Sequence, residues 1–165
     1  MEDWRKTIGR FGTLEVRRLH LIDLTQLYYR LRDYVQDYAG VENIDTAMES
    51  RLLRGAAVYL SQDTHRAWGL DLGGGDLVGI VTSSLIEHPF AGETVGFDNL
   101  WVHPDHRKNI RCVCSLLRAA FEEADECGVQ VGQARVSRQG EGSCRLYERI
   151  GVRRSFYEWE LGIVK

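Results

Sequence analysis

Alternating apolar and polar residues predict a short first strand over residues 13–19. A helix is expected next, because apolar residues then recur every three or four positions and Gly40 follows as a C-terminal cap. The apolar stripe of this helix consists of Leu24, Leu27, Leu31, Tyr34 and Tyr38. A second helix is predicted over residues 43–60, although Gly55 interrupts it and its last five residues, AAVYL, are also compatible with a strand.

Three further segments have the composition of strands. RAWGLDL (66–72) and LVGIVTSSLI (77–86) flank a glycine run, which predicts a hairpin, because glycine readily takes the positive backbone angles that tight turns need. TVGFDNLWV (94–102) follows as a fourth strand. The first four strands are therefore expected to form an antiparallel meander.

The strongest periodicity lies between residues 110 and 126 and predicts an amphipathic helix that stops at Gly128. Its apolar stripe comprises Val113, Leu116, Leu117, Ala120, Phe121 and Ala124. Its outward face is expected to carry Arg111, Ser115, Arg118, Glu122 and Asp125.

A fifth strand is predicted over 129–137, and the intervening helix favours a parallel arrangement with the fourth strand. A short helix over 143–151 and a last strand over 155–164 complete the chain. The fold class is therefore α+β: a mixed, mostly antiparallel sheet of about six strands flanked by about four helices. At 165 residues the chain is expected to be a single domain, 1–165.

Composition narrows the classes of function. A hydrophobic fraction of 44% and a net charge of −3 are typical of a globular protein and give no reason to expect nucleic acid as a partner. Apolar runs are too short for a membrane span, and the first residues lack the apolar core of a signal peptide. The four cysteines lack metal-ligand spacing, so no metal site is predicted and a cytoplasmic location is expected.

Two motifs carry a family resemblance. LWVHPDHR before the amphipathic helix, and SCRLYERIGV before the last strand, are similar to segments of the GCN5-related N-acetyltransferase (GNAT) superfamily, and the match covers nearly the whole chain. The residues that match the V-x-P-x-x-R-like and L-Y-E-x-x-G-like segments are Val102, Pro104, Arg107, Leu146, Tyr147, Glu148 and Gly151.

The resemblance implies how acetyl-CoA, the co-substrate, would bind. A bulge would splay the fourth and fifth strands, so that the backbone amides of Leu100, Trp101 and Val102 meet the pantetheine arm and the thioester. The pyrophosphate would lie in the loop that begins the amphipathic helix. The loop residues are Arg107, Lys108, Asn109, Ile110, Arg111, Cys112 and Val113.

This loop departs from the family pattern R/Q-x-x-G-x-G/A. Its glycine positions fall on Ile110 and Cys112, or on Arg111 and Val113 if aligned from the helix. Glycine allows close approach of the backbone to a phosphate, but every residue supplies an amide, and a helix start presents free N–H groups to an anion. Arg107, with its neighbours, adds cations that could offset a looser cradle. The alternative is that these cations are merely solvated.

Two residues are candidates for catalysis. Tyr147 takes the position of the tyrosine in the family's L-Y-E segment and would donate a proton to the departing thiolate; packing in the core is the alternative. Asp98 is expected on the same strand face as Leu100 and Val102, where it could accept a proton from the amine or orient it as a cation. Its alternative roles are pairing with an arginine or capping a bulge.

These features predict an N-acetyltransferase that moves an acetyl group from acetyl-CoA to a primary amine by direct attack in a ternary complex. The glycine-free loop leaves a second hypothesis, a catalytically inactive GNAT-like domain that binds acyl-CoA or a protein partner. The acceptor is a small-molecule or peptide amine, since residues 21–60 carry an acidic bias compatible with a cation. A homodimer is left open.

Overall fold

A computed structural model describes residues 14–88, 92–126, 128 and 132–134. These residues form one five-stranded sheet in the order β1-β2-β3-β4-β5. The strands are β1 (Val16–Arg18), β2 (His65–Asp71), β3 (Leu77–His88), β4 (Gly92–Val102) and β5 (Gly132–Ala134). The first four pair antiparallel and β5 pairs parallel to β4, as the sequence predicts.

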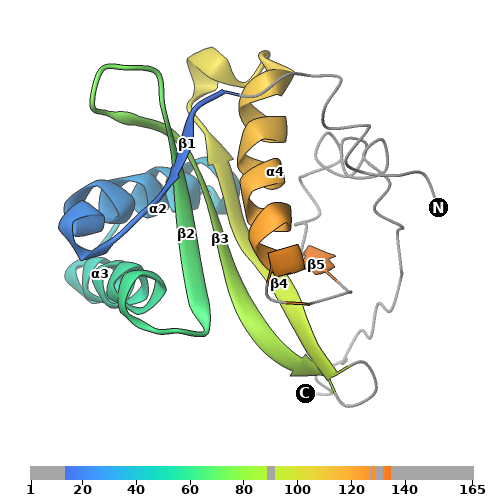
Figure 1. The fold of residues 1–165 in the computed structure, drawn as a ribbon. Helices are drawn as coiled ribbons and strands as arrows, with labels where there is room; N and C mark the ends of the chain where they lie inside the picture. The colour runs from blue at the N-terminus through green and yellow to red at the C-terminus, as the bar shows by residue number, and fades with distance from the viewer. Residues whose placement is uncertain (1–13, 89–91, 127, 129–131, 135–165) are drawn as a thin grey trace, which may run out of the picture.

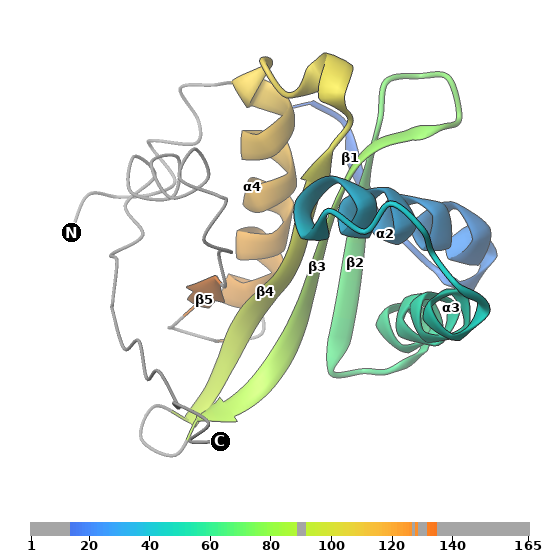
Figure 2. The ribbon, with the colours of Figure 1, turned by 180° about the vertical axis from the view of Figure 1, so that it is seen from behind.

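Helices cover both faces of this sheet. The α-helices are α2 (Leu24–Ala39), α3 (Thr46–Ser61) and α4 (Ile110–Glu126), and short 3₁₀ turns η1 (Leu21–Asp23) and η2 (Pro104–His106) precede α2 and α4. Figures 1 and 2 show α4 on one face and α2 with α3 on the other, giving three layers. The predicted sixth strand, fourth helix and splay between β4 and β5 lie outside the described residues.

Two apolar clusters hold the layers together. Between the sheet and α4 lie Trp68, Leu70, Val81, Val95, Phe97, Val102, Cys112, Leu116 and Ala120. Between the sheet and the α2–α3 pair lie Leu19, Leu27, Leu31, Ala56, Ala67, Leu77, Ile80 and Trp101. Because successive side chains of a strand point to opposite faces, each central strand supplies both clusters.

The predicted helix ends are largely confirmed. Gly40 caps α2 with φ 63°, and Gly128 follows α4 with φ 73°, both in the left-handed region that glycine tolerates. The open question at AAVYL is settled as helix, since α3 continues to Ser61. Asp45 begins α3 by accepting a hydrogen bond from the backbone N–H of Met48 at 2.7 Å.

One predicted surface position of α4 is buried. Ser115 is only 3% exposed, because its hydroxyl accepts a 2.6 Å hydrogen bond from the backbone N–H of Leu14. The segment before β1 therefore covers this side of the helix. Periodicity could not predict the contact, because the two residues are far apart in sequence.

The pairing of β3 with β4 is interrupted once. Phe97 pairs with Ser83 and Asn99 pairs with Thr82, so Asp98 is an extra residue without a partner on β3. This is a β-bulge. The resemblance placed a bulge around Leu100, Trp101 and Val102; the irregularity against β3 lies earlier, and those three residues pair regularly with Val81, Ile80 and Gly79.

Close packing of α4 on the sheet depends on Gly79. A Cβ at this position would lie 2.9 Å from Leu116 Cδ1 and 3.2 Å from the carbonyl oxygen of Trp101. We expect Gly79→Ala to lower the free energy of unfolding by about 1–3 kcal/mol, because the fully buried Leu116 side chain must shift and the carbonyl of Trp101 is crowded. Urea denaturation measures the change.

The matched control for Gly79 is Gly74→Ala in the β2–β3 turn, where nothing lies within 4 Å of an added Cβ. This variant should stay within about 0.5 kcal/mol of the parent. Equal stabilities of the two variants would contradict the packing argument.

Candidate active site

The bulge decides which face of the sheet carries Asp98. Leu100 and Val102 pack in the α4-side cluster, whereas Asp98 accepts a 3.0 Å hydrogen bond from the phenol of Tyr59 on α3. The prediction that Asp98 shares a face with Leu100 and Val102 is therefore wrong. The extra residue shifts the alternation by one, so that Asp98 and Asn99 both face the α2–α3 layer.

A polar network surrounds Asp98. The amide nitrogen of Asn99 donates to the hydroxyl oxygen of Thr82 at 2.8 Å and to the phenol oxygen of Tyr59 at 3.4 Å. Burial, with a further contribution from the charge of Asp98, raises the pKa of Tyr59 to about 12. The phenol therefore stays protonated at neutral pH and acts as a hydrogen-bond donor to Oδ2 of Asp98.

The charge of Asp98 also affects the pKa of a second tyrosine. Burial raises the pKa of Tyr34 on α2, and the charges of Tyr38 and Asp98 raise it further. The rings of Tyr34 and Tyr38 lie 5.1 Å apart between centroids. Asp98 thus faces the α2–α3 layer, where Tyr59 of α3 is its hydrogen-bond partner and its charge contributes to the raised pKa of Tyr34 on α2.

Acidic residues on this face differ in their partners. Asp33 pairs with Arg30 at 2.6 Å, and Asp37 pairs with Arg107. Asp98 is half-buried, and its hydrogen-bond partner is the neutral phenol of Tyr59. Within the described ranges, no basic side chain forms an ion pair with it. The described residues give no support to the predicted alternative of an arginine partner. Asp98 does lie at a β-bulge, as the other alternative requires.

Asp37 joins three elements on the same side of the sheet. Its Oδ2 atom accepts a 2.7 Å hydrogen bond from Nε1 of Trp101 and another from the guanidinium of Arg107. Nε of Arg107 also donates to the carbonyl oxygen of Val102 at 2.9 Å. Arg107 therefore points toward α2 and the end of β4.

The start of α4 satisfies part of its own backbone. Oδ1 of Asn109 accepts from the N–H of Arg111 at 3.1 Å, and its carbonyl accepts from the N–H of Cys112 at 3.0 Å. Lys108 and Arg111 are exposed, and neither forms an ion pair with a described residue. Two cations consequently flank the positive end of the helix dipole, an arrangement that favours a bound anion.

Comparison with protein families decides the assignment. The model of the acetyltransferase (GNAT) family matches residues 28–152, more than half of the chain. The chain belongs to the GNAT family. The family resemblance drawn from the sequence motifs is thereby confirmed.

Solved structures similar to this GNAT chain come from several sources. Ribosomal-protein-alanine N-acetyltransferase from Brucella melitensis biovar Abortus 2308 is 24% identical, with TM-score 0.67, over 88% of this chain and 97% of that one. A predicted acetyltransferase with acetyl-CoA from Clostridium acetobutylicum is 18% identical, with TM-score 0.74, over 90% and 95%. A soil metagenomic aminoglycoside acetyltransferase in complex with sisomicin is 16% identical, with TM-score 0.67, over 93% and 99%. At these identities the likeness shows the fold.

No curated protein sequence matches the chain significantly. Among the helices that the structure describes, none is long and apolar enough to cross a membrane. The described side chains also contain no group of three or more potential metal ligands.

The predicted coenzyme-binding residues divide between surface and core. Trp101 and Val102 are buried, and on the side of β4 away from β3 the described part of β5 pairs only with residues 95–97. In the loop, the side chain of Cys112 is fully buried against the sheet, where burial raises the pKa of its thiol, and its backbone N–H already donates to the carbonyl of Asn109. Tyr147 lies outside the described residues.

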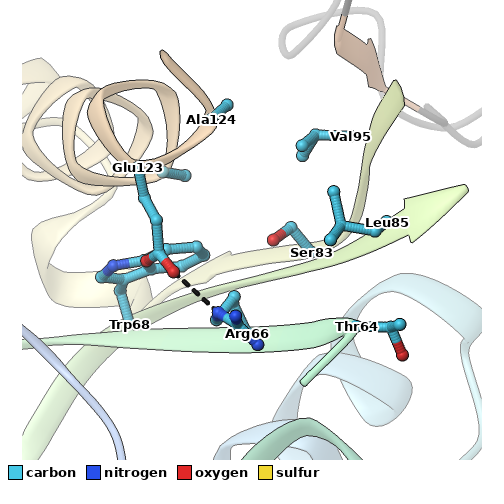
Figure 3. Close-up of a pocket in the computed structure, with 9 residues that line it drawn as sticks. Thr64, Arg66, Trp68, Ser83, Leu85, Val95, Glu123 and Ala124 are labelled. Atoms are coloured by element: carbon cyan, nitrogen blue, oxygen red, sulfur yellow. Dashed lines mark hydrogen bonds and ion pairs between the residues drawn. The ribbon is translucent and has the colours of Figure 1, made fainter. Parts of the chain in front are cut away.

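A small pocket lies on the opposite face of the sheet from Asp98. Figure 3 shows Glu123 of α4 and Arg66 of β2 in it, with Nε of Arg66 2.7 Å from the carboxylate. Because these two charges satisfy each other, they leave little for a ligand to bind. The residues around Asp98 are therefore the stronger candidate for chemistry.

Sequence reasoning missed Tyr59 and Asn99 as neighbours of Asp98, and the partnership of Asp37 with Arg107. Asn99 was adjacent to a named candidate, but alternation assigned it to the other face. Tyr59 lies in AAVYL, which the sequence places in the second helix but leaves compatible with a strand. As part of α3, Tyr59 packs on the sheet side together with Ala56.

Proposed function

We propose that this chain is an N-acetyltransferase that moves the acetyl group of acetyl-CoA to a primary amine by direct attack. The observation that carries the proposal is the half-buried carboxylate of Asp98, which has a neutral phenol as its partner in the described part of a GNAT fold. A carboxylate in such a place is stabilised by an arriving ammonium ion. The acceptor is therefore a cationic amine.

Asp98 would both receive the amine and take its proton. Tyr59 holds Oδ2, which leaves Oδ1 to accept a proton from the ammonium group directly or through water. The neutral nitrogen then attacks the thioester carbonyl, so that a C–N bond forms and the C–S bond breaks. The departing thiolate takes a proton from Tyr147, a role that rests on the family motif, and the nitrogen of the new amide gives its remaining extra proton, directly or through water, to the Tyr147 phenolate.

The pyrophosphate of acetyl-CoA is assigned to the start of α4. Lys108 and Arg111 supply charge, and first-turn amides supply donors once the anion replaces the side-chain cap of Asn109. Arg107, which the sequence also predicts as a phosphate ligand, forms an ion pair with Asp37 in the structure. The pantetheine arm would bind along residues 100–102.

We expect Lys108→Ala together with Arg111→Ala to weaken acetyl-CoA binding by about tenfold or more, because two charge-assisted contacts are lost. Isothermal titration calorimetry measures the dissociation constant. Arg51→Ala on α3 removes an exposed positive charge at a distance and should leave the constant unchanged. Equal affinities of all three proteins would place the phosphates elsewhere.

An inactive domain is the second candidate, and the glycine-free start of α4 favours it. The N–H of Arg111 is already occupied by Asn109, so an anion must compete for it. Titration with acetyl-CoA followed by turnover assays separates the two functions. Binding with acetylation of sisomicin or of a peptide with N-terminal alanine supports the enzyme; absence of acetyl-CoA binding removes it.

Three broader predictions from the sequence stay predictions: a single domain over residues 1–165, a cytoplasmic location and an open possibility of a homodimer. None of them bears on the chemistry at Asp98.

A further inference from the structure

The end of β4, the last turn of α2 and the connection to α4 meet at one carboxylate. Asp37 lies in the last turn of α2, and its Oδ2 atom accepts hydrogen bonds from Trp101 and Arg107. A charge-assisted hydrogen bond is stronger than a neutral one, so these contacts hold the three segments at a fixed separation. Arg107 also places its charge near the negative end of the α2 dipole.

Two tyrosines of α2 connect the guanidinium of Arg107 with the surroundings of Asp98. Its Cζ atom lies 5.6 Å from the ring centroid of Tyr38, within cation–π distance. Tyr38 packs on Tyr34 at 5.1 Å, and Tyr34 senses the charge of Asp98. Arg107 therefore contacts Tyr38, which packs on Tyr34, although Arg107 is the first residue of the proposed coenzyme-binding loop.

The neighbouring cations are arranged differently. Nε of Arg107 is fixed on the carbonyl oxygen of Val102, so the two sides of the guanidinium are directed at β4 and α2. Lys108 and Arg111 are exposed and have no ion-pair partner in the described part of the chain. One loop thus holds an arginine engaged with the acceptor-side helix and two cations open to an anion.

We propose that Arg107 is a positioning residue for the acceptor side of the site and not a phosphate ligand. Through Asp37 and Tyr38 it fixes the last turn of α2 and the connection 40–45 against the end of β4. Tyr34 and Tyr38 of α2, on the acceptor side, and the start of α4 would then keep one relative arrangement. The inference rests on the proposed function for its acceptor, but the positioning itself is independent of catalysis.

The test compares Arg107→Ala with Arg111→Ala in the full chain. Arg107→Ala should speed amide hydrogen exchange over residues 37–45 by about tenfold, because its ion pair and cation–π contact are lost, and leave acetyl-CoA affinity within about twofold of the parent. Arg111→Ala should weaken acetyl-CoA binding and leave the exchange rate over residues 37–45 unchanged. Asp37→Asn should resemble Arg107→Ala, and the double variant should exchange no faster than Arg107→Ala, since both substitutions break the same ion pair and Arg107→Ala already removes the contact with Tyr38.

Kinetics separate positioning from a general loss of structure. With an amine that the parent acetylates, Arg107→Ala should raise the Michaelis constant for the amine and leave that for acetyl-CoA unchanged. The proposal is overturned if Arg107→Ala weakens acetyl-CoA binding as much as Arg111→Ala does while exchange over 37–45 is unaltered. If the parent binds no acetyl-CoA, the proposed function fails, and the exchange comparison alone decides the role of Arg107.

Discussion

Asp98→Asn should lower the turnover number by about 10²-fold or more, because the amide keeps the shape of the carboxylate but cannot take a proton. Steady-state kinetics, with sisomicin or a peptide with N-terminal alanine as acceptor, measure the turnover number and the Michaelis constant for the amine. Circular dichroism checks that the variant is folded.

Asp33→Asn is the matched control, since it changes a carboxylate of the same face that is paired with Arg30. It should keep the parent turnover number. A role of Asp98 in cation binding alone would raise the Michaelis constant for the amine and retain turnover. If Asp98→Asn leaves both constants unchanged, Asp98 is a structural residue of the bulge, and the base is water or another group.

Trp101→Ala should lower the free energy of unfolding by about 3–5 kcal/mol, the usual cost of removing a buried tryptophan. Trp101 is 1% exposed and lies in the cluster between the sheet and the α2–α3 pair. Its ring also lies 5.4 Å below the guanidinium carbon of Arg30, and its Nε1 atom donates to Asp37. Urea denaturation with a two-state fit measures the loss.

A second substitution of Trp101 separates the contribution of its apolar ring from that of its hydrogen bond, and an exposed residue serves as the control. Trp101→Phe keeps most of the apolar area but loses the hydrogen bond to a charged acceptor, so about 1.5–3 kcal/mol should be lost. Ile22→Ala is the control, because Ile22 is 93% exposed and should contribute less than about 0.5 kcal/mol. A loss below about 1 kcal/mol for Trp101→Ala would show that the indole does not hold α2 on the sheet.

Local signals were sufficient for most of the elements. The stripe from Val113 to Ala124 predicted α4, and Gly40 and Gly128 predicted where helices end, because helical periodicity and left-handed caps depend on neighbours in sequence. The glycine run before β3 likewise predicted a hairpin. The motifs around Arg107 and Tyr147 pointed to the GNAT family, which the family match confirms.

The site required the tertiary structure. Strict alternation put Asp98 on the wrong face, because a bulge that depends on the pairing with β3 adds one residue to β4. Charge alone grouped Arg107 with Lys108 and Arg111, yet Arg107 reaches Asp37, which lies 70 positions away in the chain. The sequence by itself determined the order of the elements that the structure describes, the family and the cationic start of α4. Only the tertiary structure decided which side chains meet, because a bulge shifts a whole strand segment and a long side chain takes its partner from another element.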